Sequence, residues 1–454
     1  MGKGARSPFS CLRRPASNGR GRSSRYRPAP HHRRVMLFTL SLMTAVFVAT
    51  AIYFVVSRRR SLPAINLHLE RIPPIERGLR QLAGLTGGTL YEGNKARVYQ
   101  DGDLLDALYD AIENARSTVH LESYVWNRGR TEREFVELLC RKSEEGVVVR
   151  VLVDTVGAMK ASGQQLNLLR ESGVSVGFYH RISRFNIHRL NNRTHRKLLI
   201  VDGKVGFTFG HGIRDEWRGH GQDEQHWRDT GVQLEGPVVC PLQALFAEDW
   251  IEATGSPPLD EGCFLEPRQQ GTVTSHVVSS STAGGHSSVA LLYMLAIASA
   301  RHEIIIQNPY FVPAPALPDL LEKMVARGVK VRVMIPDRHS DSPIVRRAGQ
   351  RLYQRLLRAG IDFYLYEKTF LHQKIVIIDG VWSHIGSTNL DARSLALNTE
   401  AGVGLMDKDI AAQLKEAFER DLQHCRKLTL EQWSKRPRRQ RVLDWCAYQL
   451  KGQI

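Results

Sequence analysis

HRKLLIVDG, residues 195–203, occurs again in nearly the same form as HQKIVIIDG, residues 372–380. In each copy a His and a Lys two positions apart precede four apolar residues and an Asp-Gly pair. Side chains alternate between the two faces of a strand, so this His and this Lys point the same way. Four successive apolar residues are typical of a strand buried on both faces, and Asp-Gly favours a turn. Each copy therefore predicts a buried strand that presents a His and a Lys together.

The two copies lie at equivalent places in a longer internal repeat. Three further blocks recur ahead of each copy, in the same order. The paired blocks are residues 108–126 and 292–312, 144–154 and 326–337, and 168–179 and 355–366. In both halves, segments typical of helices alternate with segments rich in β-branched residues, which indicates an α/β fold. We therefore expect two αβα sandwich halves, related by a pseudo-twofold axis, with mixed, mostly parallel sheets.

The composition divides the chain into seven segments. They are a basic leader (1–34), a transmembrane helix (35–56), a juxtamembrane linker (57–85), the first half (86–253), a linker (254–288), the second half (289–430) and a basic, amphipathic C-terminal tail (431–454). The leader holds nine Arg, one Lys and no acidic residue, so we expect it to be disordered. The linker between the halves is rich in Pro, Ser and Gly, which is typical of a connection.

Residues 35–56 form a run of 22 residues without a charged side chain. A helix needs about 20 apolar residues to cross a bilayer, so the run predicts a transmembrane anchor. A cleaved signal peptide is the alternative. The basic leader is too long for one, and arginines at 58–60 stand where small residues would precede cleavage. Arginines flank both ends of the run, so the side of the membrane on which the globular part lies stays open.

The net charge of +17 attracts polyanions, which include nucleic acid and anionic lipid surfaces. Much of the excess lies in the tails, where residues 435–441 alone hold five basic side chains. The two halves lack a stripe of Arg with interleaved aromatic residues, so a nucleic-acid partner is not expected. The six cysteines lack C-x-x-C spacing, which favours buried free thiols over a zinc site or a disulfide framework.

Apolar residues at helical spacing follow this basic run. Val442, Cys446 and Leu450 can share one helix face, with Trp445 beside them. Such a face is typical of an interfacial helix on anionic lipid. A docking helix with a solvated, charged end is the alternative, and the sequence does not decide between the two.

The two motifs resemble the signature of the phospholipase D superfamily, H-x-K-x(4)-D followed by G-[SG]-x-N. The second copy carries all of it, in His372, Lys374, Asp379, Gly386, Ser387 and Asn389. The first copy carries His195, Lys197 and Asp202, then Gly210 at the Ser/Gly position and Gly212 in place of the Asn. Within the superfamily, residues 227–239, 245–250 and 307–313 resemble the bacterial cardiolipin synthases.

The resemblance implies a role for each of these residues. The implied catalytic residues are His195, Lys197, Asp202, His372, Lys374 and Asp379; the implied phosphate contacts are Lys197, Lys374, Ser387 and Asn389; and Asp229 and Glu400 are implied to orient the histidines. His195 is implied as the nucleophile and His372 as the acid/base, although the pseudo-symmetry leaves the reverse order open. Lysines supply the positive charge that a phosphoryl group needs, so no metal or cofactor is expected. Histidines at 180, 188, 211, 220 and 226 lack metal-ligand spacing.

The expected function is phosphatidyl transfer through a phosphohistidine, with two phosphatidylglycerols giving cardiolipin and glycerol. The expected partners are an anionic phospholipid and a membrane, through a single-pass anchor in a bacterial inner membrane. Three alternatives stay open. They are a phospholipase D that hydrolyses phospholipid to phosphatidic acid, a nuclease of the same superfamily, and a membrane adaptor with inactive motifs.

Overall fold

The computed structural model describes residues 30–56, 65, 67–181, 192–280 and 287–452. The chain divides into two compact units, Met1–Phe54 and Val55–Ile454. The described part of the first unit is helix α1 (Pro30–Val56), which covers the apolar run. In the described ranges, no helix is long and apolar enough to cross a bilayer, so the transmembrane helix predicted over residues 35–56 is not confirmed. The leader up to residue 29 and linker residues 57–64 lie outside the described residues.

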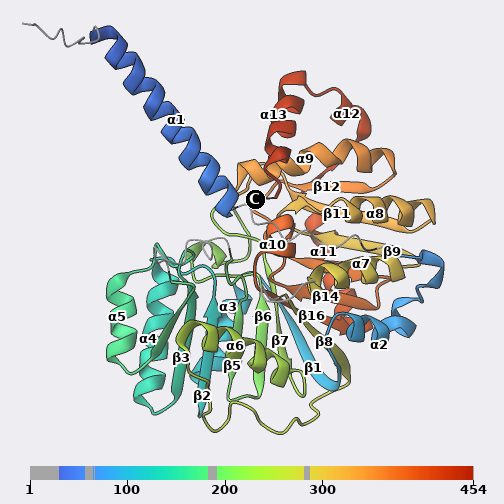
Figure 1. The fold of residues 1–454 in the computed structure, drawn as a ribbon. Helices are drawn as coiled ribbons and strands as arrows, with labels where there is room; N and C mark the ends of the chain where they lie inside the picture. Colours follow the sequence, from blue (N-terminus) through green and yellow to red (C-terminus); the bar gives the residue numbers. More distant parts are fainter. Residues whose placement is uncertain (1–29, 57–64, 66, 182–191, 281–286, 453–454) are drawn as a thin grey trace, which may run out of the picture. The chain divides into compact units, whose positions relative to one another are not determined.

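The second unit is built around one sheet of 15 strands that runs through both halves (Figure 1). The strands of the first half are β1 (Leu90–Gln100), β2 (Thr118–Ser123), β3 (Val148–Asp154), β4 (Ser175–Tyr179), β5 (Leu198–Val201), β6 (Val205–Phe209) and β7 (Thr230–Glu235). Those that follow are β8 (Val273–Ser280), β9 (Glu303–Gln307), β11 (Lys330–Pro336), β12 (Asp362–Tyr366), β13 (Ile375–Ile378), β14 (Trp382–Gly386), β16 (Glu400–Met406) and β17 (Cys425–Leu428). Strands β10 (Phe311–Val312) and β15 (Leu390–Asp391) form a separate ladder.

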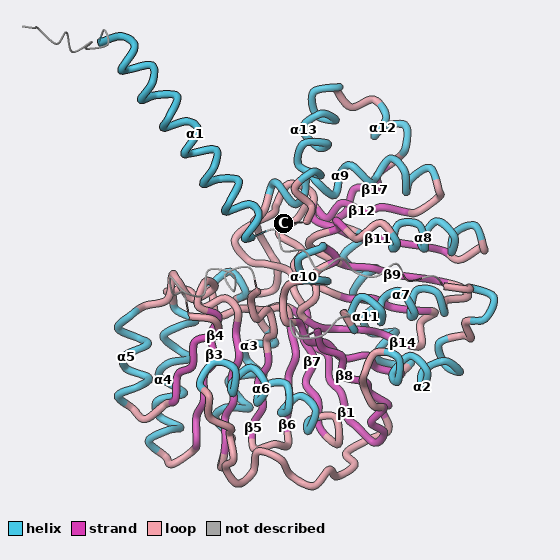
Figure 2. The backbone as a smooth tube through the Cα atoms, viewed as in Figure 1, coloured by secondary structure: helices cyan, strands magenta, loops and turns pink. Residues whose placement is uncertain are grey.

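The order across the sheet is β17-β12-β11-β9-β13-β14-β16-β8-β1-β7-β6-β5-β2-β3-β4. Strand β8 lies within the expected linker, residues 254–288, and pairs with β16 on one side and β1 on the other. The linker therefore contributes the strand that joins the halves, and the strands continue from one half into the other in Figure 2.

Helices cover both faces of this sheet. The α-helices described in the second unit are α2 (Ile75–Leu85), α3 (Asp103–Glu113), α4 (Arg130–Glu144), α5 (Gly163–Glu171), α6 (Val239–Thr254), α7 (Ser288–Ser299), α8 (Ala316–Ala326), α9 (Pro343–Arg358), α10 (Ala392–Ala396), α11 (Lys408–Leu422), α12 (Leu430–Ser434) and α13 (Arg438–Gln449). In β9, Ile304 and Ile306 pack with α7 and α8, whereas Ile305 joins the opposite cluster, to which α6 and α11 contribute Phe246 and Phe418. The mixed α/β fold expected from the repeat is confirmed.

The expectation of mostly parallel strands is wrong. The ladders β2–β3–β4 and β9–β11–β12 are parallel, but β5 and β13 pair antiparallel with both of their neighbours. For the β5–β6 and β13–β14 pairs the physical reason is the Asp-Gly pair of each motif. Asp202 and Gly203 have φ of 52° and 58°, and Asp379 and Gly380 have φ of 52° and 66°. Two successive residues with positive φ make a type I′ turn, which folds the chain into a hairpin.

Candidate active site

Each motif His lies just ahead of its strand, on a segment that pairs with the other half. The backbone N–H of His195 donates to the carbonyl of Thr399 at 2.8 Å, and that of His372 donates to the carbonyl of Arg228 at 2.7 Å. An isolated parallel bridge reinforces each contact. Since residues 400 and 229 directly follow these two carbonyls, each half presents its acid to the His of the other half.

Two histidine–carboxylate pairs therefore cross between the halves. His195 Nδ1 lies 3.0 Å from Glu400 Oε2, and His372 Nδ1 lies 2.7 Å from Asp229 Oδ2. A carboxylate only accepts, so Nδ1 carries the hydrogen, and the neutral ring keeps Nε2 unprotonated. This geometry agrees with the orienting role expected of Asp229 and Glu400. The crossing itself has no signal in the sequence, because both acids stand at equivalent places in the repeat.

The two acids are supported differently. Ser387 donates its hydroxyl hydrogen to Glu400, whereas Trp217 Nε1 donates to Asp229 at 2.9 Å. A Cβ atom on Gly210, the position equivalent to Ser387, would lie 2.3 Å from Asp229 Oδ1. Gly210 is thus required by the close approach of Asp229, and Ser387 contacts the acid behind His195 rather than lining the cleft. The sequence expectation of a phosphate contact from Ser387 is not supported by this placement.

Both motif lysines are buried beside the histidines. Lys197 Nζ donates to the carbonyl of His195 at 2.7 Å, and Lys374 Nζ lies 2.9 Å from His372 Nδ1. Burial outweighs the nearby carboxylates and lowers the pKa of Lys197 to about 7 and that of Lys374 to about 8. Both pKa values therefore lie closer to neutral pH than that of an ordinary lysine, and the negative charge of an arriving phosphate favours the charged form of both side chains.

A cleft of about 340 Å³ opens over these groups. His195, Lys197, His372 and Asn389 line it, so both halves contribute to one cavity. Asn389 is buried, and its Oδ1 has no hydrogen-bond partner in the part of the chain that the structure describes. A buried polar atom left unpaired is suited to a ligand contact. The cleft therefore combines two imidazoles with cationic and amide groups.

The two motif aspartates lie away from this cleft, at the far ends of their strands. Asp202 accepts hydrogen bonds from the backbone N–H groups of Arg116, Ser117 and Thr118, and Asp379 accepts them from those of Arg301, His302 and Glu303. Neither is among the side chains that line the cleft. The catalytic placement expected for Asp202 and Asp379 does not fit these positions, because both carboxylates are used to anchor the hairpin turns.

Both histidines are held neutral in the free protein. Burial and Lys374 lower the pKa of His372 to about 3, although Asp229 opposes the shift. Burial likewise lowers the pKa of His195 against the pull of Glu400. A neutral imidazole is the form that attacks phosphorus, but a proton donor must be charged. An anion bound beside the lysines raises both pKa values, so the site is arranged to take up a proton together with an anionic substrate.

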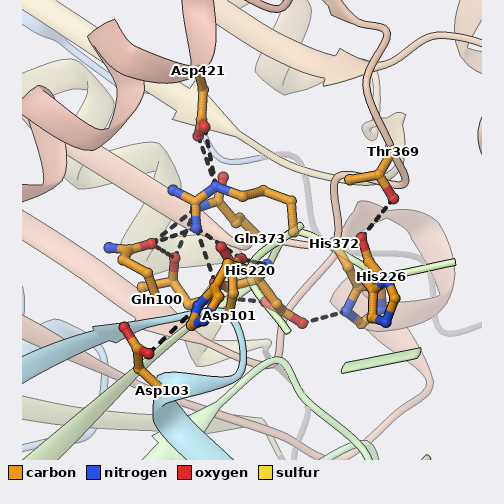
Figure 3. Close-up of polar contacts among 12 residues, drawn as sticks. Gln100, Asp101, Asp103, His220, His226, Thr369, His372, Gln373 and Asp421 are labelled. Atoms are coloured by element: carbon orange, nitrogen blue, oxygen red, sulfur yellow. Dashed lines mark hydrogen bonds and ion pairs between the residues drawn. The ribbon is translucent and has the colours of Figure 1, made fainter. Parts of the chain in front are cut away.

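A buried polar network holds Asp229 and His372 from behind (Figure 3). Arg228 Nε donates to both carboxylate oxygens of Asp421 at 3.1 Å, and a terminal nitrogen donates to Asp101 at 3.0 Å. Asp101 also accepts from the backbone N–H of Asp229 at 2.9 Å. The sequence did not identify Arg228, Asp101 or Asp421. Its one available signal was the position of Arg228 directly before Asp229.

The other histidines do not gather around a common point. His180 contacts Glu252, His211 contacts the carbonyl of Asp101, His220 contacts Asp103 and His226 contacts Asp223. Position 188 lies outside the described residues. Among the residues that the structure does describe, no group of three or more His, Cys, Asp or Glu side chains is arranged to hold a metal ion.

Known proteins resemble the chain in sequence and in fold. Residues 108–213 and 293–422 match the family described as cardiolipin synthase, phospholipase D-like domain. Cardiolipin synthase A of Pseudomonas entomophila is 38% identical over 341 residues, which cover 74% of this chain and 70% of that protein. Cardiolipin synthase 2 of Staphylococcus epidermidis is 32% identical over 348 residues, which cover 76% and 71%. The crystal structure of phosphatidylserine synthase from Haemophilus influenzae shares the fold, with a TM-score of 0.64 over 84% of this chain and 99% of that chain, at 13% identity.

Each of the two matched regions contains one H-x-K motif, and the relatives align over both halves. The chain therefore belongs to the cardiolipin synthase family of the phospholipase D superfamily, and it is a phosphatidyltransferase of that superfamily.

Proposed function

We propose that the chain makes cardiolipin, by transferring the phosphatidyl group of one phosphatidylglycerol to the glycerol hydroxyl of a second. The observation that carries the proposal is the pair of crossed histidine–carboxylate contacts over a single cleft. The similarity to cardiolipin synthases supports a lipid hydroxyl, rather than water, as the acceptor. The alternative outcomes are hydrolysis to phosphatidic acid and cleavage of nucleic acid.

In the first step Nε2 of neutral His195 attacks the phosphorus atom. The N–P bond forms as the P–O bond to glycerol breaks, and protonated His372 gives its proton to the departing oxygen. Glu400 keeps His195 in the tautomer with a free Nε2, and Asp229 stabilises the charged ring of His372. The products of this step are a phosphatidyl-histidine and free glycerol.

In the second step His372, now neutral, takes the proton from a glycerol hydroxyl of the second lipid. The alkoxide oxygen attacks phosphorus, the N–P bond breaks, and His195 returns to its neutral state. Lys197 and Lys374 neutralise the charge on the phosphoryl oxygens in both steps, and Asn389 contacts the bound headgroup. All protons balance over the cycle, and the chemistry needs no group beyond these side chains.

The reaction takes place at a membrane, because both substrates are bilayer lipids. Helix α1 exposes large apolar side chains that suit insertion into lipid; Phe38 and Phe47, for example, are 70% and 73% exposed. We infer that this segment attaches the enzyme to the bacterial inner membrane. Which side of the membrane carries the second unit is left open.

The test is to incubate the purified full chain with phosphatidylglycerol in detergent micelles and to measure products by mass spectrometry. Cardiolipin and glycerol in equal amounts are expected, and the His195→Ala and His372→Ala variants are the controls. Phosphatidic acid without cardiolipin would contradict transfer to lipid. A parallel incubation with single-stranded DNA should leave the DNA intact. Shortened DNA with untouched lipid would overturn the lipid assignment.

A further inference from the structure

Helix α13 turns apolar and basic side chains outward. Of its residues only Asp444 and Ala447 are buried. Val442 is 58% exposed and Trp445 is 53% exposed, and Leu450, at the end of the helix, is 46% exposed. Cys446 is exposed beside them. Apolar side chains gathered on one exposed helix face and rimmed by polar residues mark a surface that binds a protein or a membrane.

The buried side of the helix fixes which face is turned outward. Asp444 pairs with Arg436 at 2.8 Å and with Arg347 at 3.8 Å. Ala447 packs in a small apolar cluster with Val345 and Ala348 of α9. The helix docks through its polar and small residues and leaves the apolar face free.

A groove of about 440 Å³ runs between α9 and α13. Its lining includes Arg351 from α9, and Arg436, Arg438 and Arg441 from the start of α13 and the residues before it. Trp445 forms part of the same wall. In the described part of the chain, no acidic side chain lies within ion-pair distance of Arg351, Arg438 or Arg441. Asp444, which pairs with Arg436, also lines the groove, so the positive charge of Arg351, Arg438 and Arg441 remains uncompensated next to an exposed aromatic ring.

We propose that the outward face of α13, together with this groove, docks on an anionic bilayer, with lipid phosphates in the groove and Trp445 among the headgroups. Charge complementarity favours an anionic bilayer as the binding partner. Its leaflet supplies many phosphates, and these phosphates are not fixed in position. Tryptophan beside aliphatic and arginine side chains is typical of a helix lying in the membrane interface. The binding surface goes beyond the catalytic proposal, but its use in catalysis rests on that proposal.

The surface is physically joined to the catalytic cleft. Val345, which packs against Ala447 of α13, also lines the cleft. Arg351 of the groove lies six residues further along the same helix, or about 9 Å along its axis at the usual rise per residue. A bilayer that touches α13 is therefore close to the cleft, so a headgroup travels only a short distance to reach the histidines.

The test measures the surroundings of Trp445 in the full chain, reconstituted into vesicles of phosphatidylcholine alone or with phosphatidylglycerol. Lipids brominated on their acyl chains quench a tryptophan that enters the bilayer. The signal of Trp445 is the difference between the unchanged chain and Trp445→Phe. We expect this difference to be quenched only when phosphatidylglycerol is present, and the quenching to weaken as salt is added.

The combined Arg438→Gln, Arg439→Gln and Arg441→Gln variant should lose this quenching. Three cationic side chains at an anionic surface strengthen the binding of this surface to the membrane about a hundredfold. The matched control replaces three exposed arginines on other elements, Arg77, Arg133 and Arg327, by Gln, and it should be quenched like the unchanged chain. Quenching that is equal in the two triple variants would overturn the proposal. So would shielding of Trp445 that follows protein concentration, since this would assign the face to a second copy or another protein.

Activity in the same samples separates this proposal from the catalytic one. The Arg438/Arg439/Arg441 variant should make cardiolipin at the normal rate in detergent micelles and about tenfold more slowly in vesicles, because only the vesicle requires docking. An equal rate in vesicles would refute the docking role. Absence of cardiolipin from the unchanged chain in both media would refute the catalytic proposal and leave the quenching result standing.

Discussion

The two halves place their histidines alike but support them with different chemistry. Behind His195, the hydroxyl of Thr194 lies between Glu122 and Asp249, two buried carboxyl groups. Behind His372, the position equivalent to Glu122 is Gln307, and the equivalent of Asp249 is Asp421, which pairs with Arg228. Burial and the neighbouring Asp249 raise the pKa of Glu122. Arg196 pairs with Asp249 at 3.1 Å, as Arg228 does with Asp421, so both supports contain a buried guanidinium. The comparison teaches that duplication preserved the geometry and this ion pair, while only the first half adds a second buried carboxyl group, Glu122, with a raised pKa.

The largest effect is expected where the halves are most alike. Changing either His195 or His372 to Ala should lower kcat by on the order of 10⁴-fold or more, because each step needs both rings. Thermal unfolding should stay nearly unchanged, since neither ring supports the core. Substantial activity in one of the two variants would break the equivalence of the halves.

Arg228→Gln tests the guanidinium support of the second half. It leaves Asp101 and Asp421 buried without their cation, so the free energy of unfolding should fall by about 3–5 kcal/mol at neutral pH. Urea unfolding measures the change. Burial raises the pKa of Asp101 against the opposing effect of Arg228, so protonation at lower pH should relieve part of the loss.

Arg355→Gln is the matched control, because Arg355 also pairs with two acids but is 46% exposed. It should cost less than about 1 kcal/mol. Equal losses in the two arginine variants would show that burial of the Arg228 network contributes nothing to stability.

Exchanging the residues that flank the two acids is expected to have an asymmetric effect. Ser387→Gly removes one hydrogen bond to Glu400 and should lower kcat about fivefold, the equivalent of about 1 kcal/mol. Gly210→Ser places a Cβ atom where Asp229 lies and should lower kcat far more than Ser387→Gly does. Steady-state kinetics of both variants measure the difference. Equal tolerance at positions 210 and 387 would contradict the close packing described at Asp229.

The smallest effect concerns the proton-dependent support of the first half. The folded state raises the pKa of Glu122 above its ordinary value of 4.5, so the folded protein binds the proton more tightly than the unfolded chain. Stability from this group is present at low pH and falls as the pH rises from about 4.5 toward the raised pKa. Glu122→Gln should therefore flatten the fall in unfolding free energy with rising pH, whereas Glu137→Gln, on the exposed side of α4, should not. An unchanged pH profile in Glu122→Gln would contradict the shift.

The sequence predicted the elements that depend on local pattern. The repeat and the two H-x-K motifs predicted the α/β halves and the histidines and lysine that line one cleft. The direction of the strands was missed, because Asp-Gly was interpreted as a turn but not as a hairpin with two positive φ angles. The part played by Asp202 and Asp379 was missed for another reason, because their partners are backbone N–H groups far away in sequence.

Long-range pairing accounts for what else the sequence could not provide. Glu400 and Asp229 stand at equivalent places in the two copies, so pattern alone cannot show that each serves the opposite half. Trp217 and Arg228 both contact Asp229. Trp217 lies outside the motifs, and Arg228 lies in the segment 227–239 but received no role from it. Such contacts depend on how loops and strands pack within the fold, which sequence periodicity does not determine.

The crossing of the acids can be tested with a phosphatidyl ester whose leaving group is p-nitrophenol. This leaving group needs no proton donor, so formation of the phosphatidyl-histidine then requires only the nucleophile and its own acid. With crossed acids, Asp229→Asn should behave like His372→Ala, with one burst of nitrophenol and a stable adduct on His195 found by mass spectrometry. Glu400→Gln should behave like His195→Ala, with almost no burst. The reverse grouping, with Asp229 matching His195 and Glu400 matching His372, would contradict the crossed pairs.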